Sequence, residues 1–488
     1  MNTPSKIAAA VAVLAVAYVG SSWWLGKQTE ARYEAEVDRA LTLLGPQLLV
    51  ERRYDRGLFG ATSQLVFQFA LPAMPTDDED DEDADDAADA QAPAAPQTVR
   101  LTLQSDVRHG PLAGGRPAAA VVRTHVVDVQ GVSDEVRQAF AKAQWPEVST
   151  VHGFAGTLSG QALLPAGEMQ APADAQGSRA QWQAVTWDFT VGAGGKRQRG
   201  TVRMPQLSMT AAQADNAALG GDALVTMRME GLRASYDMTM QDGQWLMAPG
   251  KMEGELGLFE AHTGGDAASL RPLMALRDAR LEVDTTQNGE LFDIRQVVHG
   301  KGSVGEVAVE ELRAESTLRR IDGAALVQAQ ALIARVLTAA AQDQQPSFGD
   351  DEVQAMMQRF MDARPAYEDR YSATLNGHTA RLVYGLEMQE APAQTVPGMP
   401  WMFAAVQRAN MHADLHLPTA WLPVVASLLA DEGEPSVAVQ EMTQMADGFV
   451  QQGWLRKEGD AYVGEVRYGS GQLLINGKPL LGGGMPGR

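Results

Sequence analysis

Apolar and polar residues alternate along much of this chain. Leu65, Phe67 and Phe69 recur at every second position, and the same period of two recurs in residues 99–104 and 227–230. This period is typical of a β-strand with one buried face. Between residues 98 and 320 such segments are separated by Gly, Pro and Asp turns. The pattern predicts an antiparallel meander with one apolar and one polar face, and it lacks the strand–helix alternation of a parallel sheet.

Helical patterns stand at both ends of this β-rich segment. Residues 29–44 form an amphipathic stretch, and four more helices are predicted at 324–341, 350–362, 418–430 and 436–450. Strands are predicted between and after them, at 371–375, 380–388, 454–457, 461–468 and 472–475. The expected fold class is therefore α+β, with a large antiparallel β-rich body and a smaller mixed α/β C-terminal region.

The N-terminus carries a long uncharged segment. Residues 7–25 contain no charged side chain, and a helix of this length spans roughly 28 Å, close to the hydrocarbon thickness of a bilayer. Tyr18, Trp23 and Trp24 lie near its far end, where aromatic rings favour the membrane interface. We expect one transmembrane helix at 6–26, with the five residues before it in the cytoplasm and the C-terminal bulk on the other side of the membrane. A cleaved signal peptide and a buried helix of a soluble protein are the alternatives.

An acidic run interrupts the first strands. Residues 77–83 are all Asp or Glu, so this segment repels itself and cannot bury apolar surface. We expect a disordered linker rather than a calcium site, because no Gly turns the chain within the run and no EF-hand spacing is present. The expected organisation is a cytoplasmic stub, the anchor, a membrane-proximal helix with the first strands, the acidic linker, the antiparallel β-rich domain and the mixed region, at residues 1–5, 6–26, 27–71, 72–97, 98–321 and 322–488.

Charge and composition exclude several functions. The formal net charge of −21 excludes nucleic acid as a partner, because duplex binding requires a basic face. It also disfavours broad electrostatic adhesion to anionic lipid. The 488-residue chain has no Cys, which excludes disulfides, thiolate catalysis and Cys-based metal sites.

Several segments carry a family resemblance. They are residues 24–27 after the apolar stretch, 54–59 (YDRGLF), 107–112 (VRHGPL), 318–326 (LRRIDGAAL) and 462–479 at the end of the chain. In this order they resemble the YdgA-like family of bacterial proteins, a family of unknown function, although Asn is usual in that family where Arg320 stands. The acidic insertion at 77–89 departs from the family pattern. The resemblance implies an inner-membrane protein with a periplasmic body and a possible homodimer, and it supplies no catalytic residues.

No segment predicts a catalytic or metal site. Residues 300–305 match G-x-G-x-x-G, but a strand follows instead of the helix that a dinucleotide site needs, so a hairpin turn is expected. His412, Asp414 and His416 would share one face of a strand, yet the two His are roughly 13 Å apart there, too far to bind one zinc ion. His109 has no evident Ser or carboxylate partner in the sequence. We therefore predict no enzymatic activity, no cofactor and no metal.

Ligand contact is the remaining hypothesis. Met227, Met229, Met238 and Met240 recur on predicted strands, where they could fill a sandwich core or line a groove for acyl chains, because Met adapts to varied apolar partners. Arg56, beside Gly57, could meet a lipid phosphate or pair with a carboxylate of the sheet. The expected function is a non-enzymatic envelope scaffold or a binder of lipid or another apolar ligand. An enzyme acting on envelope components and an adaptor for a partner membrane protein are the alternatives.

Overall fold

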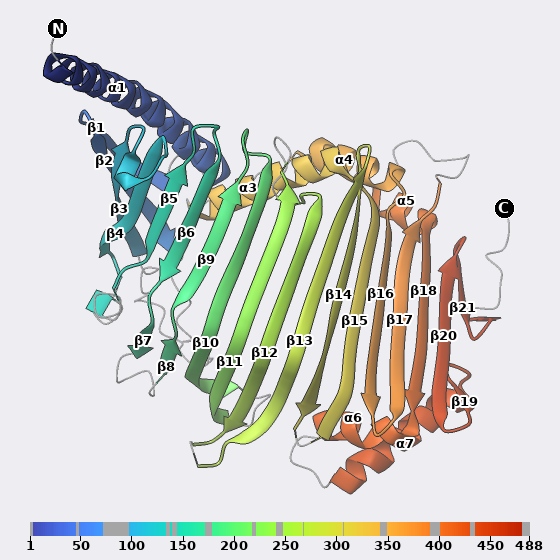
Figure 1. Ribbon diagram of the computed structural model, residues 1–488. Helices are drawn as coiled ribbons and strands as arrows, with labels where there is room; N and C mark the ends of the chain where they lie inside the picture. Colours follow the sequence, from blue (N-terminus) through green and yellow to red (C-terminus); the bar gives the residue numbers. More distant parts are fainter. Residues whose placement is uncertain are drawn as a thin grey trace, which may run out of the picture. The chain divides into compact units, whose positions relative to one another are not determined.

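The computed structural model describes the main elements of the chain and leaves short gaps between them. The described residues are 3–44, 48–71, 97–132, 137–138, 144–170, 178–216, 221–240, 247–266, 268–305, 307–341, 349–390, 401–429 and 435–480. The predicted acidic linker at 72–97 lies outside the described residues except for its last residue, which begins a strand. The fold is α+β and mostly β, as the alternation predicts (Figure 1).

The chain divides into two compact units. Unit 1 contains residues 1–169, 186–196 and 330–348, and unit 2 contains residues 170–185, 197–329 and 349–488. Three elements, β7 (Gly167–Gln170), β9 (Val185–Val191) and α3 (Gly323–Ala341), have residues in both units.

Unit 1 is a small antiparallel sheet with one long helix. The helix is α1 (Thr3–Leu44), and the sheet follows the order β1–β2–β3–β4–β5–β6, with β9 beside β6. The strands are β1 (Leu49–Arg56), β2 (Gly60–Leu71), β3 (Gln97–His109), β4 (Ala120–Gln130), β5 (Glu147–His152), β6 (Leu158–Leu164) and β9 (Val185–Val191), and a 3-10 turn η2 (Ala113–Gly115) follows β3. Each strand pairs with its neighbour in sequence through β6, as expected for a meander.

The helix α1 is continuous from Thr3 to Leu44. The predicted anchor at 6–26 and the predicted amphipathic helix at 29–44 are therefore parts of one helix. Over the residues described, none of the helices combines the length and the apolar character that a membrane crossing requires. The side chains of residues 3–16 lie outside the description.

Polar contacts hold the second half of α1 against the sheet. The Tyr33 hydroxyl is hydrogen-bonded to the Ser63 hydroxyl at 2.6 Å. Two ion pairs, Arg56–Glu30 at 2.7 Å and Arg52–Asp38 at 2.8 Å, tie β1 to the same helix. Arg52, Tyr54 and Arg56 alternate along β1, so this face of β1 is the one that α1 covers.

Unit 2 is a long antiparallel sheet. Its strands pair in the order β8–β10–β11–β12–β13–β14–β15–β16–β17–β18–β20, and β20 also pairs with β19 and β21. The strands are β8 (Arg179–Trp182), β10 (Arg197–Asn216), β11 (Gly221–Thr239), β12 (Gly250–Gly264), β13 (Arg271–Asn288), β14 (Leu291–Val304), β15 (Val307–Asp322), β16 (Ala366–Leu375), β17 (His378–Met388), β18 (Ala409–Pro418), β19 (Arg456–Glu458), β20 (Ala461–Gly469), β21 (Gln472–Ile475) and β22 (Lys478–Pro479). Residues 300–304 end β14, and Gly305, with a φ of +57°, begins the turn of the β14–β15 hairpin, so a strand follows as predicted.

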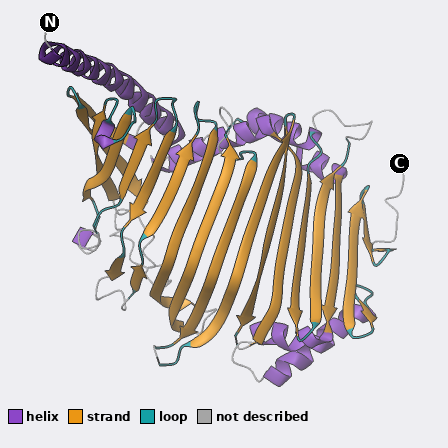
Figure 2. Ribbon diagram, viewed as in Figure 1, coloured by secondary structure: helices purple, strands orange, loops and turns teal. Residues whose placement is uncertain are grey.

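The helices of unit 2 lie at the two ends of its strands (Figure 2). At one end are α4 (Asp350–Asp362) and α5 (Trp401–Arg408), where Met361 and Ile321 are almost fully buried. At the other end the 3-10 turn η4 (Thr419–Trp421), α6 (Leu422–Leu429) and α7 (Pro435–Gln451) cover the sheet, and Trp421 and Val424 pack on Val309 and Leu375. The helices of unit 2 therefore bury apolar side chains at the ends of its strands.

Candidate functional site

One face of the unit 2 sheet is apolar from strand to strand. Residues directly opposite each other on antiparallel strands share a face, so the register defines rows that cross the sheet. One such row contains Val202, Ala234, Gly254, Leu281, Val298, Ala314, Tyr371, Leu382 and Leu415. Tyr371 and Leu382, toward the β18 end of this row, are 42% and 39% exposed. Large apolar side chains at mid-sheet therefore face open space.

A second row brings the predicted methionines into the same surface. It contains Leu207, Met229, Phe259 and Leu276, and the row beside it contains Met209, Met227, Ala261 and Met274. Met209, Met227 and Met274 are all more than 40% exposed. These methionines are therefore not enclosed in a sandwich core.

The two sets of rows share a face because several neighbouring strands contain an irregularity at the same level of the sheet. We call this line of irregular positions the crease. Leu276 and Leu281 lie five positions apart on β13, and in a regular strand an odd separation puts two side chains on opposite faces. Yet Leu276 lines the same cavity as Val298, which is the direct neighbour of Leu281. Between them Asp278 has a φ of +50°, and the register with β14 shifts at this place. The strand therefore contains a bulge that returns its apolar side chains to one face.

The same crease is present on the neighbouring strands. Gly231 of β11 has a φ of +68°. The strand pairs on either side of it place it opposite Pro205 of β10 and Gly257 of β12. Met229 precedes this position and Met238 follows it at an odd separation, so the crease brings Met238 to the face of Met227 and Met229. The sequence prediction grouped these three residues, although Met227 and Met229 are at odd positions and Met238 is at an even one, and it gave no reason why they would share a face. Met240 lies just beyond the end of β11 and is half-buried.

The crease gives a testable expectation for stability. Gly231→Ala places a Cβ on a left-handed backbone, so we expect it to lower the free energy of unfolding by about 1 kcal/mol. Gly254, on the next strand, has an ordinary φ and room for a Cβ, 3.4 Å from the Leu281 Cβ. Gly254→Ala is the control and should leave stability equal or higher. Thermal unfolding measures both, and equal losses for the two variants would contradict the role of the crease.

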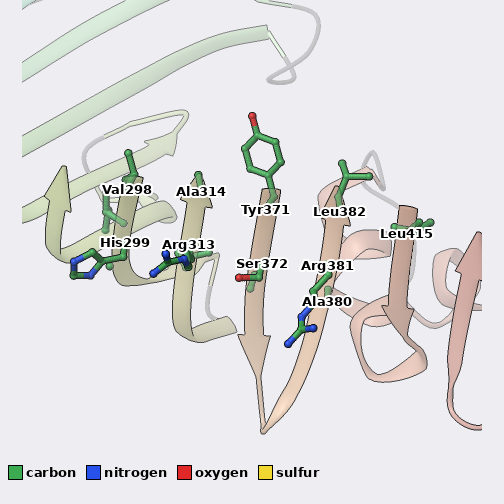
Figure 3. Close-up of a pocket in the computed structure, with 14 residues that line it drawn as sticks. Val298, His299, Arg313, Ala314, Tyr371, Ser372, Ala380, Arg381, Leu382 and Leu415 are labelled. Carbon is green, nitrogen blue, oxygen red and sulfur yellow. The ribbon is translucent and has the colours of Figure 1, made fainter. Parts of the chain in front are cut away.

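A hollow in this face lies over β13 to β18. It has a volume of about 360 Å³, and apolar side chains of Leu276, Val298, Leu312 and Leu382 line it. Figure 3 shows Tyr371 and Leu382 pointing to one side of the strands and Arg381 to the other. A hollow of this size and lining is suited to a small or flexible apolar ligand.

A buried carboxylate lies beside the hollow on the same face. Asp369 of β16 is 2% exposed and accepts hydrogen bonds from the hydroxyls of Tyr367, Tyr371 at 2.7 Å and Tyr384 at 2.9 Å. Burial by itself raises the pKa of Asp369, but hydrogen bonds from Tyr367, Ser316, Tyr371 and Tyr384 outweigh it and hold that pKa below its usual value. The carboxylate therefore stays ionised, and it fixes the orientation of three phenol rings.

The pKa values of two of these tyrosines shift in the opposite direction. Hydrogen bonding to the Asp369 carboxylate raises the pKa of Tyr367 and of Tyr371, and burial adds to it. Both hydroxyls therefore remain protonated donors at neutral pH. The sequence prediction missed this cluster, although the alternation Tyr367-Asp369-Tyr371 places three polar-capable groups on one strand face.

The opposite face of the sheet is charged and contains the predicted metal candidates. Asp414 forms an ion pair with Arg467 at 2.8 Å, and the His412 imidazole lies 3.5 Å from a Glu368 carboxylate oxygen. Asp414 and His412 are thus members of cross-strand pairs along a solvated face. Among the described residues, no group of three or more His, Cys, Asp or Glu side chains is arranged to hold a metal ion.

The two candidates of unit 1 have structural contacts. Arg56 pairs with Glu30, as described above, so its partner is a carboxylate of the helix α1 and not one of the sheet. His109 is buried at the end of β3, and its Nδ1 is 3.0 Å from the Ser22 carbonyl oxygen of α1. Gly26 packs on the same ring, because a Cβ there would lie 2.5 Å from the His109 Cε1. The His109 side chain therefore holds α1 against the end of β3.

Comparison with known proteins gives one match. A family model described as a bacterial protein of unknown function (DUF945) matches residues 4–481, nearly the whole chain. The chain belongs to this family. The segments that resemble the YdgA-like family are consistent with that membership. Searches of curated proteins and of solved structures find no match.

Membership in DUF945 leaves the site to be interpreted from its own geometry. A family of unknown function assigns no catalytic or ligand-binding residues to this fold. The described residues form an apolar sheet face with a hollow over β13 to β18, a buried carboxylate beside the hollow, and a charged reverse face.

Proposed function

We propose that the protein binds the acyl chain of a lipid along the apolar face of unit 2. The observation that carries this proposal is the continuity of the apolar rows from β10 to β18. With neighbouring strands about 4.8 Å apart, these rows extend across roughly 38 Å. Met227, Met274, Tyr371 and Leu382 are the exposed large side chains of these rows, and a continuous apolar face that exposes such groups favours a binding surface.

The chemistry of the face favours a flexible apolar ligand. Both long edges of each inner strand are already paired in the sheet, so the face offers side chains and no free backbone groups. Its methionines are unbranched and polarisable, and they adapt to chains of varied shape. Each buried methylene of a ligand contributes about 0.8 kcal/mol. A scaffold role would require the same face to be shut by protein.

We also propose that α1 attaches the protein to the bacterial inner membrane, with the bulk of the chain in the periplasm. The uncharged stretch at 7–25 supports this placement, since most of it lies before Ser22, where α1 meets the His109 ring of the sheet. A membrane-attached sheet with an apolar face is in contact with a source of lipid.

Native mass spectrometry of the full-length protein, gently extracted from its own membrane, tests the acyl-chain proposal. We expect phospholipid to remain bound through mild activation. In a variant with Met227→Glu and Met238→Glu the bound fraction should fall at least about tenfold, because two carboxylates in an apolar contact cost several kcal/mol.

The matched control places the same charges on the reverse face of the same strand. Thr226 and Thr239 are the sequence neighbours of the two methionines and point to the opposite side. A variant with Thr226→Glu and Thr239→Glu should bind lipid like the wild type. Bare wild-type protein, or equal loss in both variants, would overturn the proposal and leave a scaffold, an adaptor or an enzyme.

A further inference from the structure

Three connections at one end of the unit 1 sheet each expose large apolar side chains. β1, β3 and β5 all run toward this end, and β2, β4 and β6 run away from it. The β1–β2 turn exposes Leu58 and Phe59, the β3–β4 connection exposes Leu112, and the β5–β6 turn exposes Phe154. These four side chains, the tip residues, are between 45% and 55% exposed. Four such residues gathered at one end of a small sheet form a patch rather than scattered exceptions.

The helix α1 packs against the same end of the sheet. The Ser22 carbonyl is bonded to His109 at the end of β3, and the Tyr18 ring lies 5.9 Å from the Phe59 ring between centroids. Farther along the helix, Asp38 pairs with Arg52, which is distant from the β1–β2 turn. The contact of α1 with the sheet therefore begins at the tip residues, and the N-terminal part of the helix extends beyond them.

Aromatic side chains of α1 are exposed at this level. Trp23 and Trp24 are 52% and 53% exposed, although Ser22 and Leu25 beside them are buried against the sheet. Between Thr3 and Ser22 the helix rises about 30 Å, which is close to the thickness of the hydrocarbon core. Trp and Tyr are the side chains that favour the boundary between that core and water.

Positive charge accompanies the tip residues. Arg108, Arg116 and Arg123 are exposed and line a cavity of about 850 Å³ that Phe59 also borders. Two carboxylates, Asp55 and Asp106, share this cavity, so the charge of its lining is +1 in a chain of net charge −21. At the opposite end of the sheet, β2 ends at Leu71 and β3 begins at Gln97. The acidic run belongs to the chain between those two residues, outside the described residues.

We propose that this end of unit 1 lies in the headgroup layer of an anionic phospholipid bilayer. The tip residues and the α1 tryptophans occupy the interface, and Arg108 and Arg116 meet lipid phosphates. The occupant is a bilayer rather than a second protein, because the apolar side chains stand on separate turns around a helix that continues past them. The inference uses unit 1 alone and is separate from acyl-chain binding on unit 2.

The absence of Cys makes a direct depth measurement possible. Single cysteines at Phe59, Leu112 and Phe154 are labelled with an environment-sensitive fluorophore in the full-length chain, reconstituted into phosphatidylcholine vesicles with about 30 mol% phosphatidylglycerol. A nitroxide near the headgroup end of the lipid chain is the quencher. The control is Val127→Cys on β4, an apolar residue of the same sheet that is 41% exposed and remote from the tips.

We expect the nitroxide to quench the labels at positions 59, 112 and 154 and to leave the label at 127 unchanged. Adding Arg108→Gln and Arg116→Gln should lower the quenching to the level found in pure phosphatidylcholine. No quenching at the three tip positions, in vesicles that keep the protein through an alkaline carbonate wash, would overturn this inference while the α1 anchor stands. Quenching at the tips of a protein that the wash removes would support it while the anchor fails. Equal quenching at 127 would also overturn it.

Discussion

Arg408→Ala is expected to lower the free energy of unfolding of unit 2 by about 3 kcal/mol. Arg408 is 3% exposed, and its guanidinium donates to the Met361 carbonyl at 2.7 Å, to Asp362 at 3.0 Å and to the Gln389 carbonyl at 3.0 Å. The first two acceptors belong to the last two residues of α4, where the helix dipole favours a cation. Alanine would remove the buried guanidinium from the Met361 and Gln389 carbonyls. The Met361 carbonyl would keep the Arg364 N–H as a donor at 3.0 Å, and Asp362, which is 57% exposed, would keep its hydrogen bond from Gln358.

Urea unfolding and hydrogen exchange of the α4 amides measure this loss. Arg408→Lys keeps the charge but lacks the planar fork, so it should recover only part of the stability. Arg370, which pairs with Glu368 on the solvated face and is 58% exposed at its side chain, is the matched control. Arg370→Ala should change stability by less than about 0.5 kcal/mol. If Arg408→Ala also stayed within that limit, the cap on α4 would have no energetic role.

Asp369→Asn is expected to cost about 2–3 kcal/mol at neutral pH. The carboxylate accepts from three phenols, whereas an amide oxygen is a weaker acceptor and the amide nitrogen would face donors. The single variants Tyr371→Phe and Tyr384→Phe each remove one donor and should cost about 1 kcal/mol. Urea unfolding compares the set. A loss for Asp369→Asn no larger than that of one Tyr→Phe variant would contradict a cooperative cluster.

The same cluster predicts a direction with pH. The folded pKa of Asp369 lies below its usual value, so its stabilisation is complete above the unfolded pKa of about 3.9 and is lost as the pH falls through the folded pKa. The difference in stability between wild type and Asp369→Asn should therefore be constant at neutral pH and shrink in acid. A difference that grew below about pH 4 would contradict this sign.

Local pattern was sufficient to predict most elements of unit 2. The predicted helix at 350–362 coincides with α4, and the predicted strand at 472–475 coincides with β21. The helix predicted at 436–450 lies within α7, which is longer by one residue at each end. These elements were predictable because hydrophobic period and turn residues act over a few neighbours.

The site depended on information that no single segment contains. Gly231 is an isolated Gly in a strand pattern, which indicates a bulge. Its effect on Met238, however, depends on its alignment with Gly257 and Asp278 on other strands. Asp369 likewise gains its importance from Tyr384, which the β16–β17 register places opposite it. Register is a non-local property, so the methionines could be named from sequence but the face they share could not.

The meander of unit 2 has a consequence for how the molecule is made. From β10 to β15 every strand pairs with the strand that follows it in sequence, so each hairpin can form as soon as its second strand is available. Assembly can therefore proceed with the growing chain, N-terminal hairpins first, without waiting for distant segments. The newest strand is always an open edge that its successor covers, which limits the time in which two nascent chains can pair edge to edge.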